Sequence, residues 1–163
     1  MKVSVITNDS TVSCHEESEA EDMFGGRVTE VRNLKNLIST VCETELFFIS
    51  GAYGLVPGDT KIKRYSNVPD TRSEYQTTEE RTGFAKAVSE VTRSSDITVI
   101  FVPKEMMRII MREELQGMII SVTNVEFKNE FEKRGFVFLE RRGARVGRAN
   151  ARRIREIISS SVL

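Results

Sequence analysis

Five short apolar segments, separated by stretches with helical periodicity, constrain the fold of this chain more than any other feature. Apolar runs of this length, bounded by turn residues, are typical of strands buried on both faces. The segments are residues 2–7, 46–49, 97–102, 118–122 and 136–139. Strands that alternate with helices predict a parallel sheet covered by helices. We therefore expect an α/β fold, a three-layer α/β/α sandwich with a mostly parallel, Rossmann-like sheet of about five strands.

Helices are expected between these strands because apolar residues recur there at spacings of three and four. The predicted helices are residues 28–43, 78–93, 104–115 and 125–133, with a terminal helix near 151. Thr77 or Thr78 is expected to cap the second helix, since threonine hydroxyls accept hydrogen bonds from free helix N–H groups. The methionine-rich face of residues 104–115 is expected to fill the core.

Length and charge exclude several classes of protein. A chain of 163 residues fits one domain, residues 1–163. The 24 Lys and Arg balance the 24 Asp and Glu, which argues against a globally basic nucleic-acid binder but not against local basic patches. No apolar run approaches the roughly 18 residues of a membrane helix, and the alternating start is too short for a signal peptide. We expect a cytoplasmic protein with no membrane partner.

The segment 14–22 is acidic and contains the only histidine, His15. Cys14 and the neighbouring glutamates make a metal site conceivable, but no recognised ligand spacing is present. We expect a solvated, mobile loop with no metal, and the sequence indicates no other cofactor. Cys42 is expected to be an inert structural thiol, and both cysteines suit a reducing compartment.

A long polar segment from residue 51 to about 77 follows the apolar run 46–49. Unstructured loops of more than about 12–15 residues are uncommon in compact domains and are usually functional or disordered. We expect an ordered functional loop; the alternative is a packed surface loop without a ligand. Asp59 is a candidate catalytic group here. The candidate substrate-binding residues are Ser50, Gly51, Tyr53, Gly54, Tyr65, Asp70 and Arg72.

A second polar turn follows the first predicted strand. Asn8 and Ser10 are candidate substrate contacts, and Asp9 is a candidate catalytic carboxylate that binds or activates the substrate. The alternative is ordinary turn chemistry, because Asn, Asp and Ser side chains bond their own backbone in turns.

A third candidate site precedes the terminal helix, where glycines and arginines are interleaved. Backbone N–H groups of a glycine loop and arginine side chains bind phosphate, so Arg145, Gly147 and Arg148 are expected to bind it, with both arginines exposed. The alternative is a solvated arginine-rich helix face. In a parallel sheet all these segments would meet at the carboxyl edge, where we expect a ligand pocket.

The loop residues also resemble known families. Ser50-Gly51-Ala52-Tyr53-Gly54-Leu55 is similar to the Ser-Gly-Leu-Tyr-Gly-Leu loop of the peroxide-stress family. Leu55-Val56-Pro57, Tyr65, Val68-Pro69 and the helix start at Thr78 follow the order found in the α/β domain of archaeosine synthase. The Cys-Ser and Lys-Pro-Tyr signature expected there after the first strand is missing. The resemblance implies a similar fold and a pocket for a nucleobase or RNA.

Three functions are compatible with these observations. The first is a nucleobase- or nucleotide-related protein, with a transferase acting on a modified nucleobase in tRNA as its enzymatic form; Tyr53 or Tyr65 would stack on the base. The second is a non-catalytic module that binds RNA or a partner modification enzyme. The third is a structural or regulatory homo-oligomer.

Overall fold

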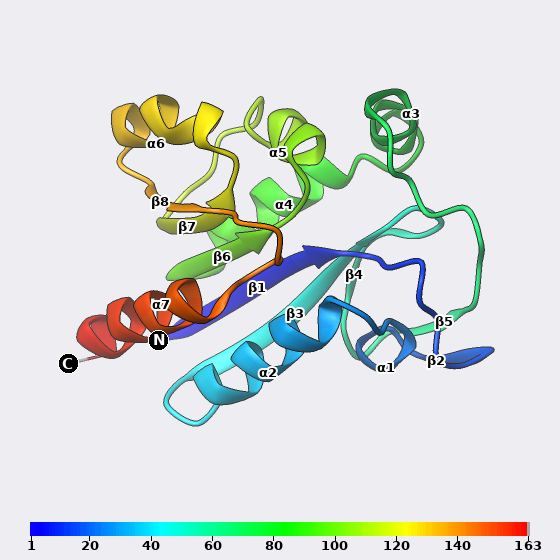
Figure 1. Ribbon diagram of the computed structural model, residues 1–163, viewed down its shortest axis with the longest axis horizontal. Helices are drawn as coiled ribbons and strands as arrows, with labels where there is room; N and C mark the ends of the chain where they lie inside the picture. Colours follow the sequence, from blue (N-terminus) through cyan, green and yellow to red (C-terminus); the bar gives the residue numbers. More distant parts are fainter. Residues whose placement is uncertain (163) are drawn as a thin grey trace.

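Six strands form the central sheet of the computed structural model, which describes residues 1–162 (Figure 1). The order is β4-β3-β1-β6-β7-β8, and all neighbours are parallel except β3 and β4. The strands are β1 (Lys2–Asn8), β3 (Glu43–Ser50), β4 (Gly54–Pro57), β6 (Ile97–Phe101), β7 (Met118–Thr123) and β8 (Val137–Glu140). The predicted α/β class and mostly parallel sheet are confirmed. Strand β4 is an addition, formed inside the segment predicted to be a loop.

The strand order defines a switch point beside β1. The chain crosses from β1 to β3 on one side and later returns to β6 on the other side. Open α/β sheets bind ligands at such points, outside the carboxyl ends of the strands. The carboxyl end of β1 is therefore the first place to look for a site.

Alternate residues of the strands enter two hydrophobic clusters. Val3 and Val5 belong to one cluster, together with residues of α2 (Val28–Ile38) and α7 (Arg148–Val162). Ile6 belongs to the other, with residues of five other helical segments. These are α3 (Arg72–Thr82), α4 (Phe84–Arg93), α5 (Lys104–Ile110), η1 (Val125–Phe127) and α6 (Lys128–Arg134). Figure 1 shows α2 and α7 apart from the α4–α6 group, with the sheet between them.

The helices are shorter than the sequence pattern predicts. Helix α2 ends at Ile38 because the chain must turn to start β3, whose Glu43 pairs with Lys2; Val41 is consequently 53% exposed. Helix α5 likewise ends at Ile110.

The single predicted helix over residues 78–93 is two helices, α3 and α4. Gly83 lies between them in the left-handed conformation, with φ of 65°. Helix α3 begins at Arg72, and its cap is Thr71, whose Oγ1 accepts a 3.2 Å hydrogen bond from the Glu74 N–H. The prediction of Thr77 or Thr78 as the cap is therefore wrong.

The acidic segment is built into the fold, so the expectation of a loop is wrong, although most of residues 14–19 are exposed to solvent as expected. Strand β2 (Glu17–Glu19) pairs with β5 (Lys61–Lys63), and α1 (Ala20–Met23) buries Ala20 and Met23. The Arg32 guanidinium donates to the carbonyl oxygens of Glu21 and Phe24. The acidic composition of the segment hides the two apolar residues, Ala20 and Met23, that anchor it in the core. Within residues 1–162, no helix has both the length and the apolar character needed to cross a membrane.

Phe48 tests the packing on the α2 side of the sheet, because it is fully buried and its ring lies 5.4 Å from that of Phe24. We expect Phe48→Ala to lower the free energy of unfolding by about 3–5 kcal/mol, since large-to-small core changes leave a cavity. Val41→Ala, on an exposed side chain, should change it by less than about 0.5 kcal/mol. Equal effects in urea denaturation would contradict this account of the core.

Candidate functional site

The carboxyl ends of β1 and β3 are joined by the side chain of Asp9. The Asp9 backbone N–H donates to the Ile49 carbonyl at 3.1 Å, which brings the residue beside the end of β3. Its Oδ2 then accepts a 2.8 Å hydrogen bond from the Gly51 N–H. The carboxylate is 1% exposed. A buried acid thus holds the two turns that the sequence marks as functional.

Tyr65 is the second group bonded to this carboxylate. Its hydroxyl donates to Asp9 Oδ2 at 2.6 Å and accepts from Ser50 Oγ at 2.7 Å. The segment that follows Tyr65 packs on Gly51, where an added Cβ would lie 2.5 Å from Pro69 Cδ. Glycine is thus required for the close approach that brings Tyr65 to Asp9.

Burial dominates the acidity of this pair. It raises the pKa of Asp9 above 3.8, although hydrogen bonds from Tyr65 and Gly51 and the charge of Arg145 act in the opposite direction. Burial, followed by the Asp9 charge, also raises the pKa of the Tyr65 hydroxyl. Asp9 Oδ1 is buried and has no hydrogen-bond partner among the described residues. Because Oδ2 accepts two hydrogen bonds, Oδ1 is the oxygen available for a proton or a ligand.

Arg145 fixes the same strand end from the other side, and the expectation that it is exposed is wrong. Its Nη1 donates to Thr7 Oγ1 at 2.9 Å, to the Asn8 carbonyl at 2.6 Å and to Asn8 Oδ1 at 2.8 Å, and its Nη2 donates to the Asp9 carbonyl at 2.7 Å. Burial, followed by the nearby charge of Arg141, lowers the pKa of Arg145 to about 10. The guanidinium stays charged at neutral pH, and its two terminal nitrogens are occupied by these internal contacts.

A cavity of about 400 Å³ opens beside these groups. Its polar lining includes Asn8, Asp9, Ser10, Asp70, Tyr75, Arg27, Arg141 and Arg145. The volume falls within the 300–1,000 Å³ range of small-molecule clefts. Two aspartates and three arginines therefore face one small space.

The ionisable residues of the lining that were not predicted from the sequence are Arg27, Arg141 and Tyr75. Arg141 has a buried Nη1 with no partner among the described residues, and burial lowers its pKa. Tyr75 is 5% exposed; burial and the charges of Asp9 and Asp70 raise its pKa to about 12. Arg141 directly follows β8, and its position after a strand is a signal that could have identified it as a candidate site residue. Tyr75 was hidden because the start of α3 was predicted to be loop.

The predicted site residues divide into two groups. Asn8, Asp9, Ser10, Asp70 and Arg145 line the cavity, while Ser50, Gly51 and Tyr65 hold Asp9. Tyr53 packs edge-on against Tyr65 with ring centroids 6.0 Å apart, and Gly54 begins β4.

The remaining predicted residues lie elsewhere. Asp59 is exposed in the turn between β4 and β5. Arg72 is the first residue of α3, and its side chain lines a hollow beside α5. Gly147 and Arg148 line a separate hollow beside Glu140. Within residues 1–162, no group of three or more His, Cys, Asp or Glu side chains is arranged to hold a metal ion.

Replacing Arg145 tests whether it is structural. We expect Arg145→Ala to lower the free energy of unfolding by at least about 2 kcal/mol, because each buried acceptor left unpaired costs about 1–3 kcal/mol. Arg148→Ala, on an exposed side chain, should change it by less than about 0.5 kcal/mol. Chemical denaturation of both variants measures the difference, and two equally stable variants would refute the structural role.

Asp9 should make stability depend on pH. A raised pKa means that the folded chain holds the proton more tightly than the unfolded chain, so the free energy of unfolding falls as pH rises from 3.8 through the folded pKa. Asp9→Asn removes this component. The stability of wild type minus that of Asp9→Asn should therefore fall as the pH rises through this range. A difference for Asp9→Asn that grows with pH would show that the carboxylate is the favoured form.

Comparison with known proteins adds no assignment: no protein-family model, no curated protein and no solved structure matches the chain.

Proposed function

We propose that the cavity at the carboxyl end of β1 binds a nucleobase, either free or as part of a nucleotide. One observation carries the proposal. Asp9 Oδ1 and Arg141 Nη1 are both buried without a partner among the described residues, and both residues line this cavity. Buried polar atoms are almost always hydrogen-bonded in native proteins, so an unpaired acceptor and an unpaired donor at one cavity favour a ligand that supplies the opposite groups.

A nucleobase has the required chemistry. Its ring and exocyclic N–H groups can donate to the Asp9 carboxylate, while its carbonyl oxygens or an attached phosphate can accept from Arg141. Arginine in particular binds planar and anionic acceptors through parallel donors. Tyr75 adds an aromatic ring and a hydroxyl to the lining of the cavity, within the influence of its acidic and basic groups. In an enzyme, Asp9 would be the proton-transfer group, because its raised pKa brings it closer to neutral pH.

The proposed architecture, pathway and cellular location rest on the sequence and on the packing of the fold. A three-layer, Rossmann-like sandwich is supported by the two hydrophobic clusters and the strand order. A role in tRNA modification rests on the resemblance of the loop to archaeosine synthase. A cytoplasmic location is supported by two free thiols, Cys14 and Cys42, which suit a reducing compartment.

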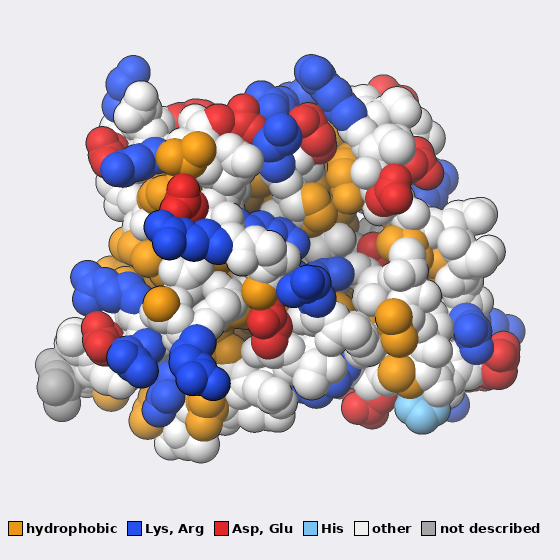
Figure 2. Space-filling model, in the orientation of Figure 1, with side chains coloured by type: hydrophobic (Ala, Val, Ile, Leu, Met, Phe, Trp, Pro, Cys, Tyr) orange, Lys and Arg blue, Asp and Glu red, His pale blue; other side chains and the backbone are white. Residues whose placement is uncertain are grey.

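A second candidate function, binding of an RNA backbone without chemistry, is favoured by helix α7. Arg148, Arg152 and Arg155 are exposed at spacings of four and three, so they share one face. None of the three forms an ion pair with another described residue. Figure 2 shows Lys and Arg side chains gathered over this side of the molecule. A basic stripe along a helix is a typical nucleic-acid footprint.

Thermal-shift measurements with free bases, nucleosides, nucleotides and a tRNA fragment test the proposal. A base or nucleotide at 100 times its dissociation constant should stabilise the wild type by about 2.7 kcal/mol. Arg141→Gln should lose this stabilisation. Arg142→Gln should keep it, because the Arg142 side chain is 82% exposed and paired with Glu140.

Other outcomes identify the alternatives. Stabilisation by tRNA alone, lost as salt is raised, would favour the RNA-binding module on α7. An equal loss in both arginine variants, or no shift with any base or nucleotide, would overturn the proposed site. A concentration-dependent mass in the absence of ligand would then favour the homo-oligomer.

A further inference from the structure

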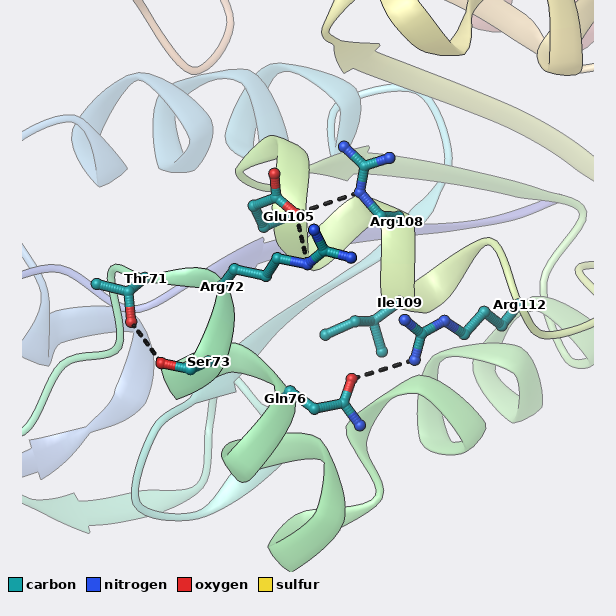
Figure 3. Close-up of a pocket in the computed structure, with 8 residues that line it drawn as sticks. All are labelled: Thr71, Arg72, Ser73, Gln76, Glu105, Arg108, Ile109 and Arg112. Carbon is teal, nitrogen blue, oxygen red and sulfur yellow. Dashed lines mark hydrogen bonds and ion pairs between the residues drawn. The ribbon is translucent and has the colours of Figure 1, made fainter.

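A second hollow lies on the other side of α3, between this helix and α5 (Figure 3). Its volume is about 560 Å³, and it shares no lining residue with the cavity at Asp9. The lining residues are Thr71, Arg72, Ser73, Gln76, Glu105, Arg108, Ile109 and Arg112. We name this space the α3–α5 groove.

Positive charge exceeds negative charge in the groove. Three arginines line it, and Glu105 is the only acid among the lining residues. Figure 3 shows Arg72 and Arg108 both directed at Glu105, while Arg112 reaches Gln76. Arg108 Nε lies 3.2 Å from Glu105 Oε2, and its Nη2 also binds Glu126. Arg108 is therefore held by two carboxylates.

The other two arginines are far less committed. Arg72 Nε lies 3.8 Å from Glu105 Oε2, and the Arg72 side chain is 76% exposed. Arg112 donates from Nη1 to the neutral Gln76 Oε1 at 3.1 Å and is exposed. Both guanidinium groups retain donors for a ligand without breaking a close ion pair.

The pKa of Glu105 agrees with an excess of positive charge in the groove. Its hydrogen bond to Arg108, with the charges of Arg108, Arg72 and Lys104, lowers the pKa of the carboxyl. Arginines therefore outnumber acids in the lining by three to one, even though the whole chain has zero formal charge. A cleft lined by one sign of charge concentrates ions of the opposite sign.

The groove also has an apolar floor and neutral polar groups. Ile109 is 4% exposed and borders the space. At one end the Ser73 hydroxyl lies 3.4 Å from Thr71 Oγ1, which is already bonded to the N–H and the carboxylate of Glu74. The parallel N–H donors of an arginine match the oxygen geometry of phosphate. The Ser73 hydroxyl can add a neutral hydrogen bond. An apolar floor beneath such donors suits an organic molecule carrying phosphate.

We propose that the α3–α5 groove is a separate binding site for a small phosphorylated molecule, with its phosphate held by Arg72 and Arg112. Arg108 and Glu105 are positioning residues, which keep the wall of α5 in place. The site is independent of the proposed nucleobase cavity, because different side chains form it.

Calorimetric titration with inorganic pyrophosphate tests the site on the full chain. Arg72→Gln combined with Arg112→Gln should weaken binding at least tenfold, whereas Lys86→Gln combined with Arg93→Gln on α4 should leave it unchanged. The control variant also removes two positive charges, but from exposed positions outside both proposed sites. Circular dichroism should show that both variants remain folded, since all four side chains are exposed.

Three results would overturn the proposal. These are no pyrophosphate binding by the wild type, an equal loss in the control variant, and binding only of a single-stranded RNA oligonucleotide. The Arg141→Gln variant separates the two proposals. If only the nucleobase proposal is wrong, pyrophosphate still binds, and its binding still depends on Arg72 and Arg112. If the groove alone is wrong, base binding still depends on Arg141.

Discussion

The contact of Arg145 with the end of β1 is the interaction on which the candidate site depends. One guanidinium, supplied by the loop before the last helix, binds oxygen atoms of Thr7, Asn8 and Asp9. The Val146 N–H beside it donates to Glu30 on α2 at 2.5 Å. The turn after the first strand is thus fixed by residues more than a hundred positions away. Because this turn carries Asp9, the orientation of the buried carboxylate depends on the last loop of the fold.

Asp9 in turn explains why the segment after β5 crosses the carboxyl edge. The Tyr65 hydroxyl and the Gly51 N–H bind the same oxygen, so one carboxylate joins β1, β3 and the chain that leads to α3. A carboxylate buried in this way costs free energy unless its oxygens are satisfied. Leaving Oδ1 without a partner is therefore a cost that packing alone does not explain, and native proteins tend to carry such costs at functional sites.

The sequence predicts the periodic parts of this structure well and its long-range contacts poorly. The five predicted strands are all present, and they and the class of fold followed from apolar runs, because burial on both faces leaves a strong local signal. The sequence also predicted that Asn8, Asp9, Ser10 and Asp70 lie close together, because they belong to segments that follow strands. All four line one cavity. The burial of Arg145 could not be predicted, because its partners are distant in the chain and an arginine beside glycines is usually exposed. Likewise β2, β4 and β5 are three or four residues long and are defined by pairing rather than by composition.

The positions of the arginines support ligand binding at both of the spaces beside α3. Arg27, Arg141 and Arg145 line one cavity, and Arg72, Arg108 and Arg112 line the groove on the other side of α3. Arg141 and Arg145 are close enough for the charge of one to lower the pKa of the other, so the folded chain holds like charges together in partly buried positions. Such repulsion opposes folding, and an anion bound between the arginines would relieve it. Stability and binding are then linked, since a ligand that interacts only with the folded state raises its free energy of unfolding.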